Sequence, residues 1–188
     1  MIKVTLKLTS AAPYSQSKHY EVPKKEKESA ADYEERTWRE RLHVTEDGEV
    51  FIPPMALKNC LAEAAKYLSE QIKGKGKATY TKHFEAGVLV MDALMLGVKK
   101  DAVKGEKLFV PADGKRGGSK RVWKFFPVIP KWEAVATVWI LDQTITRSVF
   151  ERHIRQAGRF IGMGRFRPRN NGIYGRFDAE IVAWEEAE

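Results

Sequence analysis

A stretch of twenty residues near the C-terminus, Gly158 to Phe177, has a composition suited to binding phosphate groups. It contains five glycines, five arginines, four aromatic residues and no acidic residue. Glycine lets the backbone approach a ligand closely, guanidinium groups match phosphate oxygens, and aromatic rings offer faces on which bases stack. The stretch therefore predicts a loop that holds a nucleic-acid backbone, with single-stranded RNA favoured. The alternative is a solvated loop whose aromatic residues belong to the core.

Basic side chains outside the twenty residues form two further groups, a Lys/Arg-rich turn and a lysine-rich connector. Each side chain could neutralise a phosphate, although a solvated loop also collects lysine. The candidate RNA-binding residues of all three groups are Lys75, Lys77, Lys115, Arg116, Lys120, Arg121, Arg165, Arg167, Arg169, Tyr174 and Arg176. Trp38 and Tyr80 lie in basic surroundings and either stack on bases or pack in the core. Ile161 and Phe177 are assigned to the core.

Cleavage of RNA without a metal usually needs a histidine near the 2′-hydroxyl. His83 is the first of the four histidines to test, because it lies in the basic connector, although a non-catalytic role is favoured. His43 lies in a hairpin arm next to Arg39 and Arg41, and His153 is expected to be exposed on a helix. No cluster of carboxylates indicates a two-metal nuclease, and the glycine-rich loop lacks the GK[ST] ending of a P-loop. We therefore expect neither catalysis nor a cofactor.

The positive charge of the chain is segregated along the sequence. The net charge is +8, and residues 99–132 carry ten of the lysines and arginines. Residues 178–188 carry five acidic residues and no basic one. Segregated positive charge suits a polyanionic partner, and the acidic tail is expected to face away from it.

The length of 188 residues fits one domain, 1–188. Cys60 is the only cysteine, so the sequence excludes an intrachain disulfide and a cysteine-based zinc cluster. A buried structural thiol in a reducing cytoplasm is favoured. The apolar runs are short and the N-terminus has no signal-peptide core, so we expect neither a membrane span nor secretion.

The first fifty residues predict a strand, a polar segment and a hairpin. Residues 2–9 alternate between apolar and polar, as in a half-buried strand. Residues 10–35 are polar and highly charged, so we expect an exposed loop or insertion, and we expect residues 15–35 to become protected on RNA binding. Residues 37–53 predict a β-hairpin that turns at residues 46–48.

An amphipathic helix is predicted over residues 55–72. Pro53 and Pro54 precede it, where proline suits a first helical turn, and Gly74 is expected to end it. Its apolar stripe recurs at steps of three and four. The stripe consists of Leu57, Leu61, Ala64, Ala65, Leu68 and Ile72.

The second half repeats this order of elements. Residues 87–98 predict a central strand, residues 108–130 a β-excursion, and residues 133–142 another strand. Thr146 is expected to cap a second helix. Its stripe is Phe150, Ile154, Ala157 and Ile161. In the last strand, residues 177–184, Trp184 is expected on the side opposite to Ala183. The sum is an α+β, ferredoxin-like (RRM-like) βαββαβ palm with β-hairpin insertions at about 10–53 and 99–131.

Two motifs in this order resemble the RAMP superfamily of CRISPR effector proteins. RAMP proteins enter their first helix through Ile-Pro, a small-residue pair and Leu-Lys. Ile52, Pro53, Leu57 and Lys58 match this entry, whereas residues 54–56 depart from the usual Gly-Ser-Ser. The departure removes hydroxyl donors and makes Lys58 the main candidate phosphate contact there.

The second motif resembles the RAMP glycine-rich loop, which leads from the second helix into the last strand. The matching residues are Gly162, Gly164, Arg165, Gly172, Gly175 and Arg176. The resemblance implies that Gly162 and Gly164 contact RNA. Some RAMP subunits cut target RNA with a loop aspartate, but neither Asp32 nor Asp92 has a diagnostic motif around it.

Within the superfamily the chain is most similar to the subunit that polymerises along guide RNA. That resemblance implies a crRNA-binding backbone subunit of a ribonucleoprotein in antiviral defence. Its partners would be single-stranded guide RNA, copies of itself and other effector-complex subunits, and a complementary target strand stays open. The alternatives are a RAMP-type endoribonuclease that processes CRISPR RNA, and a mimic of such a subunit encoded by a mobile element.

Overall fold

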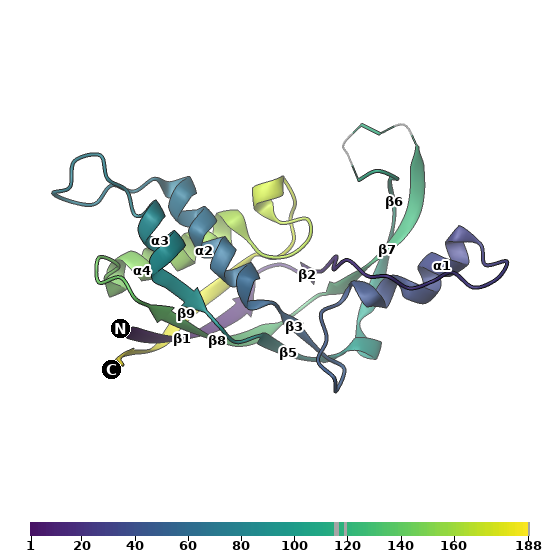
Figure 1. The fold of residues 1–188 in the computed structure, drawn as a ribbon, viewed down its shortest axis with the longest axis horizontal. Coiled ribbons are helices and arrows are strands. Elements are labelled where there is room, and N and C mark those ends of the chain that lie inside the picture. Colours follow the sequence, from purple (N-terminus) through teal and green to yellow (C-terminus); the bar gives the residue numbers. More distant parts are fainter. Residues whose placement is uncertain (115–116, 119, 188) are drawn as a thin grey trace.

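The palm of the molecule is a four-stranded antiparallel sheet with helices on one face (Figure 1). The computed structural model describes residues 1–114, 117–118 and 120–187, so the predicted site residues Lys115 and Arg116 lie outside it. The strands are β1 (Ile2–Ser10), β4 (Val88–Val90), β8 (Glu133–Ile140) and β9 (Phe177–Glu186), in the spatial order β4-β8-β1-β9. The helices are α2 (Pro54–Leu68), α3 (Thr81–Gly87) and α4 (Arg147–Gln156).

The chain order β1-α2-β4-β8-α4-β9 is the ferredoxin-like βαββαβ arrangement. The predicted fold class is therefore confirmed. The core lies between the sheet and α2 and α4, where Val4, Leu6 and Leu8 of β1 are fully buried. Both predicted helical stripes reach this core, and the Thr146 hydroxyl accepts a hydrogen bond from the Val149 amide as the expected cap.

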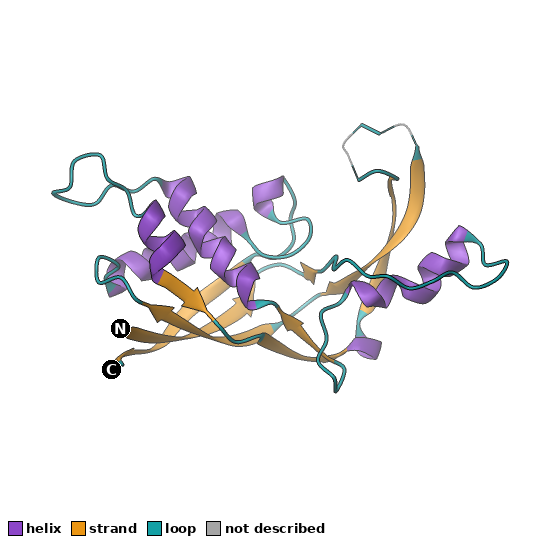
Figure 2. Cartoon of the chain, viewed as in Figure 1, coloured by secondary structure: helices purple, strands orange, loops and turns teal. Residues whose placement is uncertain are grey.

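A second module extends from the palm (Figure 2). Its three-stranded sheet has the order β2-β7-β6, with β2 (Tyr14–Ser15), β6 (Lys104–Pro111) and β7 (Arg121–Ile129). Helix α1 (Ala30–Thr37) and the 3₁₀ turn η1 (Trp38–Arg41) pack against β7. The two-stranded pair β3 (Glu49–Ile52) and β5 (Leu94–Lys99) lies between the modules in Figure 1. Short turns complete the chain: η2 (Lys100–Ala102), η3 (Ala157–Ile161) and η4 (Pro168–Asn170).

Part of the polar segment 10–35 is helical, which differs from the expected loop. The Ser29 hydroxyl accepts a hydrogen bond from the Asp32 amide and so caps α1. Glu34 of this helix is buried and pairs with Arg41 at 3.0 Å. The segment folds because its charges find partners inside the chain, a possibility that net polarity does not reveal.

The predicted hairpin over 37–53 is confirmed beside its turn, where Val44 bridges Val50 and the Thr45 amide donates to the Glu49 carbonyl, and is wrong in the outer part of its first arm. Residues 38–41 form the 3₁₀ turn η1, and only the second arm is a strand, β3, which pairs with β5. Trp38 of the first arm is buried against Phe125 and Gly105 of the second module. Because this indole is buried against the second module, the outer part of the arm cannot pair with β3. Of the two predicted alternatives for Trp38 and Tyr80, stacking on bases or packing in the core, both residues take the second.

Two predicted boundaries in the palm are also wrong. Helix α2 ends at Leu68, where Ser69 adopts the left-handed conformation and its hydroxyl donates to the Lys66 carbonyl. The predicted central strand 87–98 is two strands, because the chain bends at the exposed Asp92. Its first part, β4, is an edge strand of the palm, and its second part, β5, joins β3.

Trp184 and His153 face the core instead of the predicted outer side. The pairing of β1 with β9 shifts by one residue between Thr5 and Leu6, so Val182 is bulged and the faces of the following residues exchange. The Trp184 ring lies 5.9 Å from that of Phe150. His153 is fully buried, and its Nδ1 lies 2.8 Å from the Val149 carbonyl.

Cys60 is buried and its thiol lies 3.5 Å from the Ala157 carbonyl, as predicted for a structural thiol. Burial raises the pKa of this thiol far above its ordinary value. Within the described residues, no helix combines the length and the apolar character that a membrane crossing requires.

Candidate nucleic-acid interface

The glycine-rich loop is hydrogen-bonded to residues 13–15, which follow β1 and include β2. The Gly175 amide donates to the Pro13 carbonyl at 2.7 Å, and the Arg165 amide donates to the Ser15 carbonyl at 2.8 Å. The Met163 amide closes the loop on itself by donating to Gly175 at 3.0 Å. These bonds hold the loop in one place beside β2.

The glycines of this loop are required by the packing of the chain on itself. Gly164 has φ +78, and a Cβ there would collide with the Ser15 carbonyl oxygen. A Cβ on Gly162 would lie 2.7 Å from Pro168 Cδ. Protein atoms thus occupy the place that a side chain would take at both glycines. The predicted contacts of Gly162 and Gly164 with RNA stay predictions, and Gly164 borders a groove.

Arg165 is the central cation of the loop. Its Nε donates to the Ser15 hydroxyl at 3.0 Å, and its guanidinium lies 3.9 Å from the centre of the Phe126 ring. Nη2 donates to Glu106 at 3.3 Å. Burial lowers the pKa of Arg165, and the nearby Glu106 opposes this shift. Because arginine stays charged in proteins, Arg165 is a partly desolvated cation held in a fixed orientation.

The other predicted loop residues are placed differently. Arg167 Nη2 donates to Glu63 of α2 at 2.9 Å. Arg176 donates to the carbonyls of Arg159 and Ile173, so it bonds the base of the loop. Arg169 is exposed within η4.

Tyr174 shares Glu106 with Arg165. Its hydroxyl donates to Glu106 at 3.0 Å, and its ring meets the exposed Phe166 edge to face at 5.8 Å. Burial raises the pKa of Tyr174, as does the hydrogen bond to Glu106. The neutral phenol therefore orients the carboxylate that also positions Arg165.

Three adjoining hollows lie between the palm and the second module, and Arg165 lines two of them. The first hollow, of about 310 Å³, lies between the loop and the first turn of α2. The second, of about 560 Å³, lies between the loop and the β6–β7 hairpin. The third, of about 230 Å³, adjoins both. Ser17 lines all three. We call them together the basic groove, defined by Ser17, Lys18, Arg41, His43, Pro53, Ala56, Lys124, Phe126, Gly164, Arg165, Phe166 and Arg167.

Sequence reasoning missed four cationic or titratable residues of this groove, namely Lys18, Arg41, His43 as a binding residue, and Lys124. Arg41 is buried, donates to the Glu34 carboxylate, and donates to the Tyr20 hydroxyl at 2.9 Å. Burial and the neighbouring Lys18 lower the pKa of His43. The mixture of basic and aromatic residues along β7 could have indicated that Lys124 binds RNA. The segment around Lys18 has no such pattern.

The remaining predicted residues lie outside the basic groove. Lys75 and Lys77 occupy an exposed turn beyond α2, the free loop at the far side of the palm in Figure 1. Lys120 and Arg121 are exposed at the end of the β6–β7 hairpin. Their predicted contacts to RNA stay predictions.

Lys58 bonds two backbone carbonyls of α3. Its Nζ donates to Phe84 at 2.8 Å and to Glu85 at 2.7 Å. Partial burial lowers the pKa of this ammonium group, and Glu85 opposes the shift. The geometry is that of a cation at a helix C-terminus, so Lys58 joins α2 to α3 instead of facing the basic groove.

We expect Lys58→Met to destabilise the protein without weakening RNA binding. Losing charge-assisted hydrogen bonds costs about 1.5–3 kcal/mol, which urea unfolding would measure, and RNA affinity should stay within about twofold of the parent. Lys66→Met, at an exposed position of the same helix, is the control and should change neither. A loss of RNA affinity at unchanged stability would restore the predicted phosphate contact.

His83 carries an oriented imidazole on α3. Its Nδ1 lies 2.6 Å from an Asp142 carboxylate oxygen, at the end of β8. Burial alone would raise the pKa of Asp142, but hydrogen bonds from His83 and Thr144 together lower it below its ordinary value. His83 lines none of the three hollows of the basic groove.

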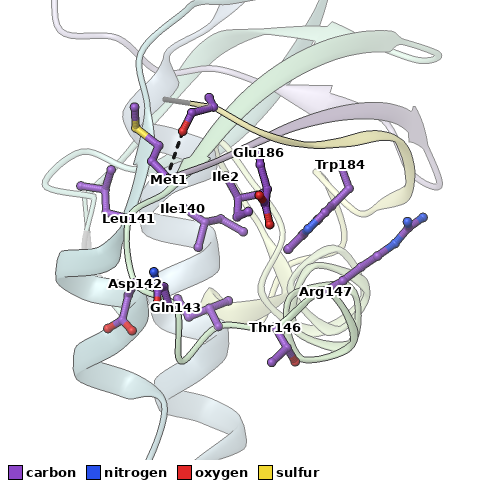
Figure 3. A pocket seen from close by; sticks show the side chains of 12 residues that line it. Met1, Ile2, Ile140, Leu141, Asp142, Gln143, Thr146, Arg147, Trp184 and Glu186 are labelled. Atoms are coloured by element: carbon purple, nitrogen blue, oxygen red, sulfur yellow. Dashed lines mark hydrogen bonds between the residues drawn. The ribbon is translucent and has the colours of Figure 1, made fainter.

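Another hollow, of about 490 Å³, lies at the end of the palm where both termini meet (Figure 3). There the Met1 amino group donates to the Ala187 carbonyl at 3.2 Å. Asp142, Glu186 and Arg147 give its wall mixed charge. It contains none of the predicted RNA-binding residues, and its charge does not favour a polyanion.

Comparison with known proteins gives a match at the level of structure. No protein-family model and no curated protein matches the sequence. The crystal structure of Cmr6 from Pyrococcus furiosus is similar over 94% of this chain and 98% of that chain, with a TM-score of 0.51 and 13% identity. The chain has a RAMP-like fold. At this identity the likeness establishes the fold alone.

Proposed function

We propose that this chain is a non-catalytic RNA-binding subunit of a CRISPR-type ribonucleoprotein and that it holds guide RNA in the basic groove. One observation carries the proposal: on a RAMP-like fold, the glycine-rich loop and two distant segments bring Arg165, Lys18 and Arg41 to one continuous groove. Aligned cations in a groove neutralise successive phosphates.

Single-stranded RNA is the ligand that this groove favours. Phe166 is exposed at its edge beside Arg165, and Phe126 lies under the Arg165 guanidinium. Unpaired bases stack on aromatic faces and on arginine planes, whereas the bases of a duplex are not available for such contacts. The guide strand is thus the part of the complex to which the groove would bind.

The finer proposal is that several copies bind in succession along one guide. We expect a purified chain mixed with unstructured RNAs of increasing length to give complexes whose mass, measured by sedimentation velocity, rises in steps of one protomer. A complex that stays at one copy on every RNA would contradict the polymerising subunit and leave RNA binding intact. No binding to any RNA at low salt would contradict the whole proposal.

RNA cleavage is the second candidate function, and the His83–Asp142 contact favours it. A carboxylate that orients a histidine is a feature of general acid–base sites. Because His83 lies outside the basic groove, we expect a hairpin repeat RNA to stay intact after incubation with the protein. Specific cleavage that His83→Ala abolishes would overturn this expectation and establish the endoribonuclease.

A further inference from the structure

Ser17 lies where the three hollows of the basic groove meet, since it lines all of them. The residue is exposed, and its hydroxyl makes no hydrogen bond in the part of the chain that the structure describes. A hydroxyl can both donate and accept a hydrogen bond. Ser17 therefore presents an unused donor and an unused acceptor to a ligand in the basic groove.

The other hydroxyl groups of the residues that line these hollows are already bonded inside the protein. The Tyr20 hydroxyl accepts a hydrogen bond from Arg41 Nη1 at 2.9 Å. Tyr14 is buried, and its hydroxyl accepts a hydrogen bond from Gln16 Nε2 at 3.1 Å. Among the described residues that line the hollows, the hydroxyl that stays available to a ligand is therefore that of Ser17.

The residues on both sides of Ser17 are anchored to other segments of the chain. Gln16 is buried, and its side-chain carbonyl accepts a hydrogen bond from the His43 amide at 2.8 Å. The Lys18 amide donates to the Arg41 carbonyl at 3.0 Å. The backbone at Ser17 is thus held before a ligand arrives, and a group held in this way loses little freedom on binding.

Cations for phosphate and a ring for a base line the same hollow as Ser17. The guanidinium of Arg165 lies 3.9 Å from the centre of the Phe126 ring, and that of Arg41 lies 5.4 Å from it. Both arginines line the second hollow together with Ser17 and the exposed Phe166. In a nucleotide the ribose connects the phosphate to the base. A strand that has phosphates on the arginines and a base on Phe166 therefore has a ribose between them.

We propose that the Ser17 hydroxyl hydrogen-bonds a ribose 2′-hydroxyl and thereby makes the basic groove selective for RNA over DNA. The inference rests on the proposed function and names the residue that recognises the sugar. The 2′-hydroxyl donates and accepts, as the serine hydroxyl does, and it is the group by which a protein distinguishes RNA from DNA at a given site. Phosphate oxygens only accept, and the arginines of the groove are the donors that suit them.

Ser17→Ala tests the proposal with a single-stranded RNA and a DNA of matching sequence that has uracil in place of thymine. The parent should bind the RNA more tightly. In fluorescence anisotropy, Ser17→Ala should lose about 2- to 12-fold in RNA affinity, as for one neutral hydrogen bond, and stay within twofold for DNA. Ser17→Thr keeps the hydroxyl and should keep most of the selectivity. Ser148→Ala, which removes an exposed hydroxyl on α4 outside the groove, is the control and should change neither affinity.

A series of RNAs, each with one 2′-deoxynucleotide, locates the ribose that Ser17 contacts. The RNA should be short enough to hold one copy of the protein. For the parent, one position in the series should lose affinity by the same factor as Ser17→Ala loses on the unmodified RNA. For Ser17→Ala, the deoxynucleotide at that position should cause no further loss, because a double-mutant cycle gives a coupling only for groups that interact. A 2′-fluoronucleotide there, which keeps an RNA-like sugar conformation, should behave as the deoxynucleotide does.

The outcomes distinguish recognition of the ribose from the proposed function. Equal losses of RNA and DNA affinity in Ser17→Ala would assign the hydroxyl to a phosphate or a base and overturn the proposal. A parent that binds RNA and DNA equally, or a folded Ser17→Ala protein that keeps the full preference for RNA, would overturn it too, and each would leave RNA binding in place. If the parent binds no RNA, the proposed function fails and with it the recognition that rests on it.

Discussion

Replacing Arg165 with alanine is expected to weaken single-stranded RNA binding about 10- to 150-fold, because a hydrogen bond from a charged group contributes about 1.5–3 kcal/mol. Arg165 borders two of the three hollows of the basic groove, and Ser15, Glu106 and Phe126 hold its guanidinium in place. A preoriented cation loses little freedom when a phosphate or a base binds. Fluorescence anisotropy with a labelled RNA at fixed salt would measure the change.

The salt dependence of binding gives a second readout for Arg165. Each phosphate contact on a single strand contributes about 0.7 to the slope of log affinity against log salt. We expect Arg165→Ala to lower the slope by about that amount, whereas Arg165→Lys should keep the slope and lose part of the affinity, because it keeps the charge without the planar fork. An unchanged affinity in a folded Arg165→Ala protein would remove the basic groove from the proposed function.

The matched control for Arg165 is Arg155→Ala. Arg155 is exposed on α4, pairs with Glu151 at 2.9 Å, and lines none of the hollows of the basic groove. Its loss removes one positive charge from the protein, as the loss of Arg165 does. An effect of equal size in both variants would indicate nonspecific attraction by net charge instead of a site.

Gly175→Ala is expected to have the largest effect on folding stability, about 2–5 kcal/mol. Gly175 is buried with φ +75, and a Cβ would overlap the Met163 carbonyl oxygen. The left-handed backbone costs about 1–2 kcal/mol for alanine, and overpacking adds about 1–3 kcal/mol. Chemical denaturation followed by circular dichroism would measure the loss.

Gly74→Ala isolates the backbone contribution. Gly74 has φ +79 but is exposed, and a Cβ there meets nothing within 4 Å. It should lose only the strain of about 1–2 kcal/mol. Equal losses of stability in the two variants would mean that the loop accommodates a Cβ at Gly175 without a packing penalty. The hydrogen bonds to Pro13 and Ser15 would then not fix the position of the loop.

The Gly175→Ala and Gly74→Ala variants should also differ in their affinity for RNA. Under conditions in which both variants are folded, Gly175→Ala should weaken RNA binding, because displacement of the loop moves Arg165 out of the basic groove. Gly74→Ala should bind RNA as the parent does. Full RNA affinity in Gly175→Ala would show that the groove does not depend on the conformation of the loop.

The βαββαβ order was predictable because each palm element carries its own local period. Alternation over β1 and β8 and the three-to-four spacing of α2 and α4 are properties of short segments, and burial against the common core enforces them. The same local reasoning missed His153. That residue lies four after Val149 and three after Phe150, both buried, so the helical spacing was a signal for its burial.

Where pairing between strands decided the outcome, local patterns were not sufficient. A one-residue bulge between β1 and β9 turned Trp184 toward Phe150, although alternation counted from Phe177 placed it outside. The apolar run 87–98 became two strands in two sheets. Neither feature has a local signature, because a register shift and a change of sheet are properties of the partner strands.

The sequence by itself determined the RAMP-like palm, the site of the glycine-rich loop and the clustering of positive charge. Only the tertiary structure decided which cations share a groove, since the residues that meet there come from segments up to 150 positions apart, as Arg165 and Ser15 do. It also assigned Lys58 and Arg176 to backbone carbonyls. The physical reason is that composition records which groups could bind phosphate, whereas hydrogen bonds between distant segments fix where each cation points.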